Sequence, residues 1–457
     1  MRNSRSSAPR RHYLPLVIPP EDTSAPHVPR ERSPLCLLGD VLPEADTLLE
    51  HLRMTAPGLH QLSLTGDLRR RTELVGGAVE LLVSADDPAP VLEAFTGALG
   101  VAEVLQREQA RCTVRMGDDM RVSLRVLPEE DFAPVLHALT GSKAHLTRLH
   151  ALARQQGLHL SHRGLHRSDG TRLPAPDEAT LYRLLGMQYI PPELREDTGE
   201  LEAALAGRLP EDLIALEHLQ GAVHAHSTWS DGRNSLEEMA RSARSLGLRY
   251  LTVTEHSQSA IYAGGLKVEA LRRQWEEIDR LNATLPGIRL LKGIEVDILE
   301  SGALDYPDGV LEQLEVVIGS IHVRHGLDEE RMTRRVLRAM DNPHLHILGH
   351  PTGRLLQRRA PYPLRVEAVL DKAAERGVAV EVNGNPQRLD LKDQHVRQAV
   401  QRGVRLVMSC DAHDVVSLGN LRYAVATARR GWTRREDVLN TLPADRFVST
   451  LRELRVS

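Results

Sequence analysis

The second half of the chain contains a series of short apolar runs, and each of them ends in a residue that can bind a metal ion. The first run leads into His224 and His226, whose spacing of two puts both side chains on one face of a strand. Later runs between residues 250 and 413 end in the same way. They lead to His256, Glu295, His322, His350 and the pair of Asp411 and His413. This pattern predicts a set of strands whose carboxyl ends carry metal ligands.

The segments between these runs have the apolar spacing of amphipathic helices. Ser235 and Glu238 have the spacing of a capping box, and an inward stripe runs from Leu236 to Leu246. Strands that alternate with helices favour a parallel sheet with right-handed crossovers. The active site of a parallel barrel forms at the carboxyl ends of its strands. We therefore expect the ligand residues to converge there, joined by Asp231 from the first loop.

The order of the motifs resembles a known family. His-x-His, Ser-Asp-Gly, Glu-His-Ser, Gly-x-Glu, Ser-Ile-His, Gly-His-Pro and Asp-Ala-His follow one another between residues 224 and 413. Over about residues 216–457 they resemble the PHP (polymerase and histidinol phosphatase) domain. The resemblance implies a distorted (β/α)7 barrel with a trinuclear metal site. The implied ligands are His224, His226, Asp231, His256, Glu295, His322, His350, Asp411 and His413.

The ligand set also indicates the chemistry. Mixed imidazole and carboxylate ligands suit Zn²⁺, Mn²⁺ or Fe²⁺ better than Mg²⁺, so three such ions are the expected cofactors. We expect Glu295 to bridge two of them. His226, His322 and His413 are candidates for the acid that protonates the leaving group, a role that the sequence does not separate from metal binding. Glu255 stands where the family usually has Asp, and we expect it to act only through its neighbours.

Four further residues near the predicted site leave two interpretations open. Arg324 and Arg354 follow ligand-bearing strand ends, and they are either phosphate contacts or surface charges. Trp229 in the first loop could stack on a base. Packing on the barrel rim is the favoured prediction for this side chain. Cys410 is either an additional soft ligand or, as we expect, a core residue.

The first half of the chain divides into three predicted parts. Residues 1–35 are rich in Arg, Pro and Ser, which predicts a flexible tail. Residues 36–185 alternate strand and helix patterns, which predicts a small α+β domain. Residues 186–215 mix Glu, Asp and Leu and are expected to be a helical linker into the domain at 216–457.

The α+β domain resembles the palm and thumb of a bacterial family X DNA polymerase, a family that carries a C-terminal PHP domain. The marks are Gly66-x-Leu-Arg-Arg70, Thr140-Gly-Ser-Lys143 with His145, and the run from Ile190 to Asp197. The lyase and fingers regions of the family have no counterpart ahead of this palm. We therefore expect an N-terminally truncated relative.

The polymerase chemistry is missing from this domain. Nucleotidyl transfer by two metal ions needs a set of closely placed carboxylates. The family's three aspartate positions align with Ala78, Glu80 and Ser123, which leaves a single carboxylate. Asp67 replaces the serine of the turn that meets the triphosphate, and its charge would repel an anion. The sequence thus predicts a degenerate palm without polymerase activity.

A DNA-positioning role for this domain is the open alternative to a solvated basic face. The cations concerned are Arg69, Arg70, Arg71, Lys143, Arg148, Arg163 and Arg167. The net charge of −4 excludes a global basic field for nucleic acid. Three scattered cysteines favour a reducing cytosol, so we expect a cytoplasmic protein. No apolar run approaches the length of a membrane span.

Three functional hypotheses follow. The first is a hydrolase, a metal-dependent 3′–5′ exonuclease or phosphodiesterase that acts on DNA ends in DNA repair. The second is a small-molecule phosphomonoesterase of the histidinol-phosphatase type. The third is a non-catalytic DNA-binding or scaffold protein. Retention of all nine ligands in a chain that has lost its polymerase residues favours the first two, because a redundant site tends to lose ligands.

Overall fold

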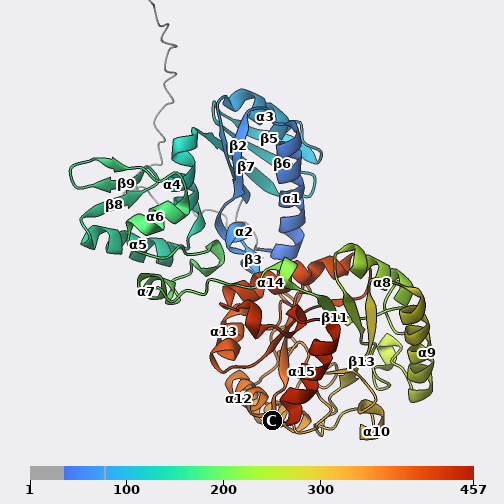
Figure 1. The fold of residues 1–457 in the computed structure, drawn as a ribbon. Helices are drawn as coiled ribbons and strands as arrows, with labels where there is room; N and C mark the ends of the chain where they lie inside the picture. Colours follow the sequence, from blue (N-terminus) through green and yellow to red (C-terminus); the bar gives the residue numbers. More distant parts are fainter. Residues whose placement is uncertain (1–34, 77–78, 457) are drawn as a thin grey trace, which may run out of the picture.

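The computed structural model describes residues 35–76 and 79–456 (Figure 1). The predicted tail, apart from Leu35, and the degenerate palm position Ala78 lie outside the described residues. The described chain forms three packed units, whose cores are separate clusters of buried apolar side chains. Their mixed α and β content confirms the predicted fold class.

The first unit is a five-stranded sheet in the order β2, β4, β7, β6, β5. These strands are β2 (Leu59–Leu64), β4 (Val79–Ala85), β7 (Arg121–Leu127), β6 (Arg111–Met116) and β5 (Val101–Arg107). Helices α1 (Leu38–Thr55) and α3 (Pro88–Thr96) bury their apolar faces against one side of the sheet. Helix α4 (Glu129–Thr140) covers the other side. Short elements β1 (Cys36–Leu37), α2 (Gly66–Arg70) and β3 (Leu74–Val75) lie at the end nearest the barrel (Figure 1).

The second unit is smaller and follows directly. It contains α5 (Lys143–Gln155), the antiparallel strands β8 (Leu158–Ser161), β9 (Gly164–Arg167) and β10 (Arg172–Leu173), and helices α6 (Glu178–Leu184) and α7 (Glu200–Leu205). Ser142 caps α5 by accepting a hydrogen bond from the backbone of His145. Ile190, Leu194 and Leu201 belong to the core of this unit. Much of the segment expected to be a linker is therefore packed with it.

The third unit is a closed parallel barrel of seven strands, as the PHP resemblance predicted. The strands are β11 (Gly221–Ala225), β12 (Tyr250–Val253), β13 (Arg289–Asp297), β14 (Val316–Ser320), β15 (Ile347–Leu348), β16 (Ala379–Asn383) and β17 (Leu406–Ala412). The strands follow chain order, and β17 pairs with β11 to close the barrel. Helices surround it: α8 (Leu236–Ser245), α9 (Val268–Thr284), α10 (Asp308–Leu311), α11 (Glu329–Ala339), α12 (Val366–Arg376), α13 (Asp393–Gln401) and α14 (Leu421–Arg430). The predicted capping box of α8 is present, with Ser235 and Glu238 as its partners.

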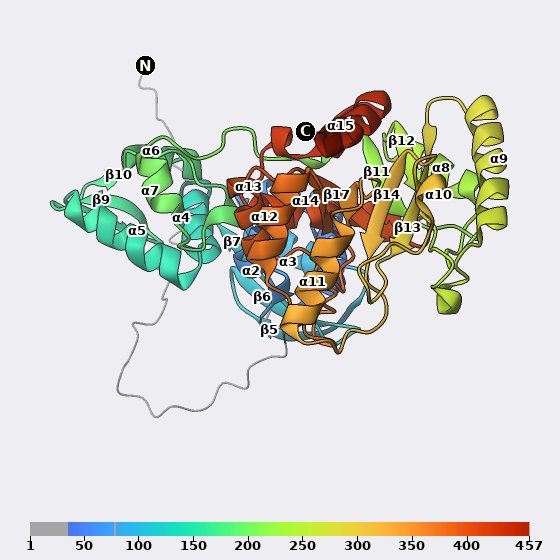
Figure 2. The same cartoon turned by 90° about the horizontal axis from the view of Figure 1, so that it is seen from below.

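The last helix, α15 (Ala444–Val456), closes the amino-terminal end of the barrel (Figures 1 and 2). Its Phe447 is fully buried and stacks on Tyr250, with ring centroids 5.4 Å apart. Val223, Leu291 and other inward residues of the strands pack in the same cluster. This end of the barrel is filled with apolar side chains, so a functional site has to lie at the opposite, carboxyl end.

The sheet unit and the barrel share a core. Leu389, from the loop after β16, and Tyr423 of α14 are buried in the apolar cluster that includes α1. Arg430 donates hydrogen bonds to the backbone oxygen of Arg70 and to Glu196. The barrel therefore packs directly on both preceding units.

Candidate metal centre

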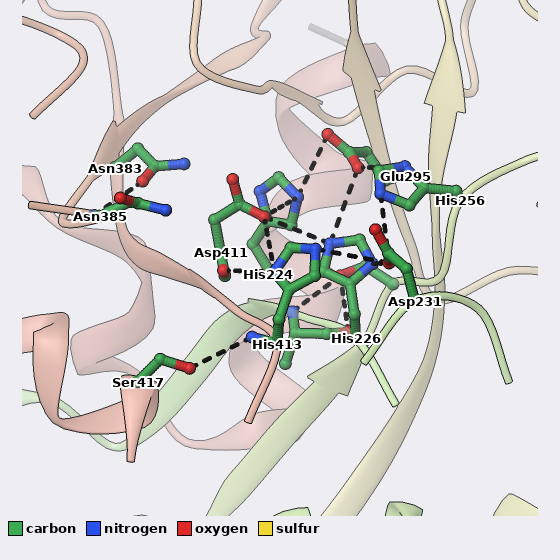
Figure 3. A network of polar contacts seen from close by, with 12 residues as sticks. His224, His226, Asp231, His256, Glu295, Asn383, Asn385, Asp411, His413 and Ser417 are labelled. Atoms are coloured by element: carbon green, nitrogen blue, oxygen red, sulfur yellow. Dashed lines mark hydrogen bonds and ion pairs between the residues drawn. The ribbon is translucent and has the colours of Figure 1, made fainter. Parts of the chain in front are cut away.

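The nine predicted ligands all lie at the carboxyl end of the barrel. Figure 3 shows part of this cluster, with His224, His226, Asp231, His256, Glu295, Asp411 and His413 labelled. His224, Glu295 and Asp411 belong to strands β11, β13 and β17, and the others follow the strands. His224, His350 and Asp411 have positive φ values of 68°, 21° and 51°. Such values are uncommon outside glycine and collect at functional sites, where the surrounding structure sustains the strain. The pairing register of β11 with both neighbours shifts beside His224, which turns this strand end toward the centre.

Glu295 lies in the middle of the cluster. Its Oε1 is 2.9 Å from His350 Nε2, 3.1 Å from His322 Nε2 and 3.2 Å from His224 Nε2. Its Oε2 is 2.9 Å from His256 Nδ1. Burial alone would raise the pKa of Glu295, but the surrounding histidines, first His322 and His224, hold it well below the usual range. The carboxyl group is thus placed to be shared between ions.

Two further carboxylates complete the cluster. Asp411 Oδ1 lies 3.3 Å from His226 Nε2 and 3.6 Å from His224 Nε2. Asp231 Oδ1 lies 3.4 Å from His413 Nε2 and 3.6 Å from His256 Nε2. The side chains of Asp231 and His413 are about one-third exposed. The side chains of His224 and His226, which flank Asp411, are fully buried. The cluster therefore opens to solvent on the side of Asp231.

The donor atoms fit divalent metal ions. Four overlapping sets of three or four residues bring ligand atoms within 4.8 Å of one another, and together the sets contain all nine residues. The buried His224 Nε2, His226 Nδ1, His226 Nε2 and Glu295 Oε2 have no hydrogen-bond partner. An unsatisfied buried polar atom costs about 1–3 kcal/mol. Ions coordinated by these lone pairs would remove that cost, and imidazole with carboxylate is a common ligand set for Zn²⁺, Mn²⁺ and Fe²⁺.

Two acidic residues that the sequence did not single out orient the imidazoles. Glu381 Oε1 accepts a hydrogen bond from His224 Nδ1 at 2.5 Å, and Asp297 Oδ1 accepts one from His322 Nδ1 at 2.6 Å. Such contacts fix the ring and leave Nε2 free as a ligand. Glu381 is a buried charge on the one barrel strand without a predicted ligand, and Asp297 lies on the same face as Glu295, two positions on. Both features were visible signals in the sequence.

Glu255 lies behind the first loop. It accepts hydrogen bonds from the backbone nitrogen of Ser227 at 3.0 Å and from the hydroxyl groups of Ser227 and Ser230. Burial raises the pKa of Glu255 to about 7, against the effect of these hydrogen bonds. The contacts tie Glu255 to the loop that carries Asp231. They are the kind of indirect effect that the sequence led us to expect.

The residues predicted to meet substrate are dispersed. Trp229 donates its indole hydrogen to Glu277 of α9 at 2.7 Å and packs against the barrel core. Arg324 is exposed and 3.9 Å from Glu300. Arg354 is buried, forms an ion pair with Glu73 of the first unit at 2.8 Å and donates to the backbone oxygen of Leu389. Arg354 therefore joins the barrel to the first unit. Its place in the sequence, just after a strand end, does not reveal this role.

Two other side chains border the cluster. Arg388, which the sequence did not indicate, places Nε 3.4 Å from Asp411 Oδ2. It follows β16, the strand that had no predicted ligand. Cys410 is fully buried within β17, and burial raises the pKa of its thiol. A buried neutral thiol behaves as a small apolar residue.

The degenerate palm positions that the structure describes lie on neighbouring strands. Glu80 of β4 is directly paired with Ser123 of the parallel strand β7. Arg125 Nη2 binds Glu80 Oε1 at 2.7 Å, and Ser123 Oγ lies 2.9 Å from Thr113 Oγ1. The one remaining carboxylate is thus neutralised by an arginine.

Several basic residues proposed to position DNA are held in ion pairs. Arg69 binds Glu178, Arg70 binds Asp67 and Glu196, and Arg148 binds Asp197 and Glu202. By contrast, Lys143, Arg163 and Arg167 are exposed.

Two segments of the chain match known protein families. Residues 222–385 match the PHP domain, and residues 135–196 match the DNA polymerase beta thumb. With the seven-stranded barrel and its cluster of ligands, this defines the class: a PHP-domain hydrolase, a metal-dependent phosphoesterase. Over 90% of its length the chain is 36% identical to the DNA polymerase/3′-5′ exonuclease PolX of Bacillus subtilis (strain 168), of which the match covers 71%. The chain belongs to this PolX family, which confirms the resemblance noted in the sequence.

Other relatives match about half of the chain. A probable phosphatase of Thermoanaerobacter sp. (strain X514) is 30% identical over 49% of this chain and 88% of the relative. A probable phosphatase of Caldanaerobacter subterraneus subsp. tengcongensis is 27% identical over 55% of this chain and 96% of the relative. No helix among the described residues is long and apolar enough to cross a membrane.

Proposed function

We propose that this protein is a metal-dependent 3′–5′ exonuclease or phosphodiesterase that acts on DNA ends in DNA repair. The observation that carries the proposal is the convergence of all nine imidazole and carboxylate ligands around Glu295. A barrel that served only as a structural scaffold would not need the complete set of nine ligands. The relative in Bacillus subtilis, which is similar across both the thumb and the barrel, supports DNA as the substrate.

Three divalent ions, Zn²⁺, Mn²⁺ or Fe²⁺, fit the donor set. One would be held by His224, His226 and Asp411, and one by Asp231, His256 and His413. The third would be held by Glu295 with its neighbours His322 and His350. Ions of this kind, when bound, generate a nucleophile from water at neutral pH and neutralise phosphate oxygens.

The side chains of the protein contribute orientation and proton transfer. Glu381 and Asp297 hold His224 and His322 with Nε2 facing the centre. Of the three candidate acids, His226 is fully buried and His322 is 10% exposed, whereas the His413 side chain is 34% exposed at the open side. His413 is therefore the most accessible of the three, and it could protonate a leaving oxygen only while its Nε2 is not bound to an ion.

Polymerase activity has been lost in this proposal. Glu80 is paired with Arg125, and the neighbouring position holds Ser123. A pair of catalytic ions needs carboxylates that reach both of them, and a single neutralised glutamate does not provide these. The α+β domain would then serve the barrel as a packing partner, and its Lys143, Arg163 and Arg167 are exposed.

A small-molecule phosphomonoesterase is the second candidate. The similarity of the barrel to probable phosphatases supports it. One assay separates the two functions: a 5′-labelled single-stranded oligonucleotide is incubated with Mn²⁺ and the protein, and p-nitrophenyl phosphate is tested alongside. A ladder of shortened products from the wild type, absent from the His224→Ala, His226→Ala variant, is the expected result. Hydrolysis of p-nitrophenyl phosphate without any oligonucleotide cleavage would instead establish the second candidate.

A further inference from the structure

The loop after β12 presents two large apolar side chains at the mouth of the metal centre. Ile261 and Tyr262, in the short helix η3 (Ile261–Ala263), are 85% and 66% exposed. The ring of Tyr262 lies 6.3 Å from the ring of His256 and 6.5 Å from the ring of His322. Water-exposed apolar side chains beside a functional cluster indicate a binding surface when they are held in place.

Contacts on both sides hold this loop. Ala260 and Ala263 flank the exposed pair and are buried. Ser259 donates from its hydroxyl group to Asp297 at 2.5 Å and from its backbone nitrogen to Asp305 at 2.7 Å. A Cβ atom at Gly265 would lie 2.0 Å from the backbone oxygen of Ser257, so the loop closes tightly only with glycine there. The fold therefore fixes Ile261 and Tyr262 outward, and Asp297 joins the loop to the ligand His322.

The rest of the mouth combines apolar and cationic side chains. Val323 and Val416 follow the ligands His322 and His413 and are 44% and 82% exposed. The side chains of Arg233 and Arg324 are 82% and 74% exposed. Nucleotides offer matching chemistry, because a flat apolar base lies within several ångströms of an anionic phosphodiester. A small polar phosphomonoester would leave the apolar surface without a partner.

We propose that Tyr262, supported by Ile261, is a stacking platform for a base next to the phosphodiester that is hydrolysed. This inference rests on the proposed function and deepens it by assigning a nucleobase subsite. Aromatic side chains stack on bases without sequence preference, and their replacement by alanine weakens binding markedly. The subsite would therefore favour a 3′ end that carries bases over one that lacks them, whatever the sequence.

The test compares two oligonucleotides that differ only in whether the last two nucleotides carry bases. The measured quantity is the ratio of kcat/KM with bases to kcat/KM without them. Tyr262→Ala should lower this ratio roughly tenfold to a hundredfold. Tyr262→Phe keeps the ring and should preserve the ratio, and Ile261→Ser should lower it less. Leu99→Ser, which removes an equally exposed apolar side chain far from the barrel mouth, is the matched control.

A second readout does not depend on turnover. An oligonucleotide with 2-aminopurine in its last two positions and phosphorothioate linkages is bound to the metal-loaded protein, and stacking is measured as fluorescence quenching. Quenching by the wild type that is lost in Tyr262→Ala supports the platform. An unchanged ratio and unchanged quenching in Tyr262→Ala would overturn it while leaving nuclease activity intact. If the wild type cleaves no oligonucleotide, the proposed function fails, and the quenching alone decides whether the base subsite exists.

Discussion

At the scale of single residues, two carboxylates outside the set of nine candidate ligands orient its imidazoles. Glu381 and Asp297 accept hydrogen bonds from the Nδ1 atoms of His224 and His322. Without these acceptors the rings could rotate or change tautomer, and Nε2 would no longer be held toward Glu295. Eight of the nine candidate ligands stand at the end of an apolar run, which is why the sequence indicated them, and Asp231 lies in the first loop. The two orienting acids left signals in the sequence, a charge within the apolar run of β16 and a spacing of two from Glu295, but their histidine partners could not be assigned because these are far away in the sequence.

Asp297→Asn and Glu381→Gln should each weaken metal binding about 10- to 100-fold, since an amide cannot accept the imidazole proton as a carboxylate does. Competition with a chelator of known affinity measures this. Asp279→Asn, which changes an exposed carboxylate paired with Lys292, is the control and should bind metal as the wild type does. Equal affinity in all variants would show that the imidazoles are held by the barrel alone.

His346 provides a pH-dependent test of the barrel away from the metal centre. Burial lowers the pKa of His346 to about 3, and its Nδ1 accepts a hydrogen bond from the backbone nitrogen of Val317 at 3.1 Å. Below pH 6.5 the unfolded chain gains a proton at this residue and the folded protein does not, so stability falls as the pH falls from 6.5 toward 3. Between pH 7 and pH 5 this amounts to about 2 kcal/mol.

Denaturant unfolding at pH 7 and pH 5 measures the difference. His346→Asn keeps an acceptor for the Val317 nitrogen but does not titrate. The loss of unfolding free energy between pH 7 and pH 5 should therefore be about 2 kcal/mol smaller in this variant than in the wild type. The same pH dependence in both proteins would contradict the buried, neutral state of His346.

At the scale of elements, helix α15 determines which end of the barrel is open. Phe447 enters the amino-terminal end and stacks on Tyr250, and together with Leu451 it fills the interior below the strands. The alternation of strands and helices predicted a parallel sheet with the ligands at the carboxyl ends of its strands, and the PHP resemblance implied the seven-stranded barrel. It did not predict that the last helix would plug the other end, because a helical apolar stripe does not specify its partner.

Phe447→Ala should destabilise the protein by about 3–5 kcal/mol, because it leaves a cavity in a filled core. Metal affinity of the folded variant should stay within a few-fold of the wild type, since the helix lies at the opposite end from Glu295. Thermal unfolding and chelator competition test the two parts. Arg446→Ala, an exposed neighbour on the same helix, should leave both unchanged. A large loss of metal affinity in Phe447→Ala would contradict the separation of the two ends.

At the scale of the whole molecule, the first unit, with its five-stranded sheet, packs directly on the barrel. Leu389 is buried in the core that contains α1, and Arg354 links Glu73 to the Leu389 backbone. The loop that carries Leu389 also carries Arg388, beside Asp411. The sequence predicted both units from their own patterns. It left Arg354 open between a phosphate contact and a surface charge, because sequence spacing does not reveal which surface another unit covers.

Leu389→Ala should lower the free energy of unfolding by about 2–5 kcal/mol, as other large-to-small changes in a core do. Leu389 joins the first unit to the barrel. The midpoint temperatures of unfolding, measured with one signal from each unit, should therefore fall together. Leu99→Ala, at an exposed position of the first unit, is the control. A shift confined to one unit would show that the two unfold independently.

Glu295 and the eight residues around it are expected to form a site for three metal ions, and the metal content of the purified protein tests this expectation. Inductively coupled plasma mass spectrometry after loading with Mn²⁺ or Zn²⁺ and removal of free metal gives the number of ions per chain. We predict about three ions for the wild type and fewer for Glu295→Gln, which changes the carboxylate that contacts four of the imidazoles. A folded wild-type protein that retains no divalent metal, or the same content in Glu295→Gln, would contradict the account.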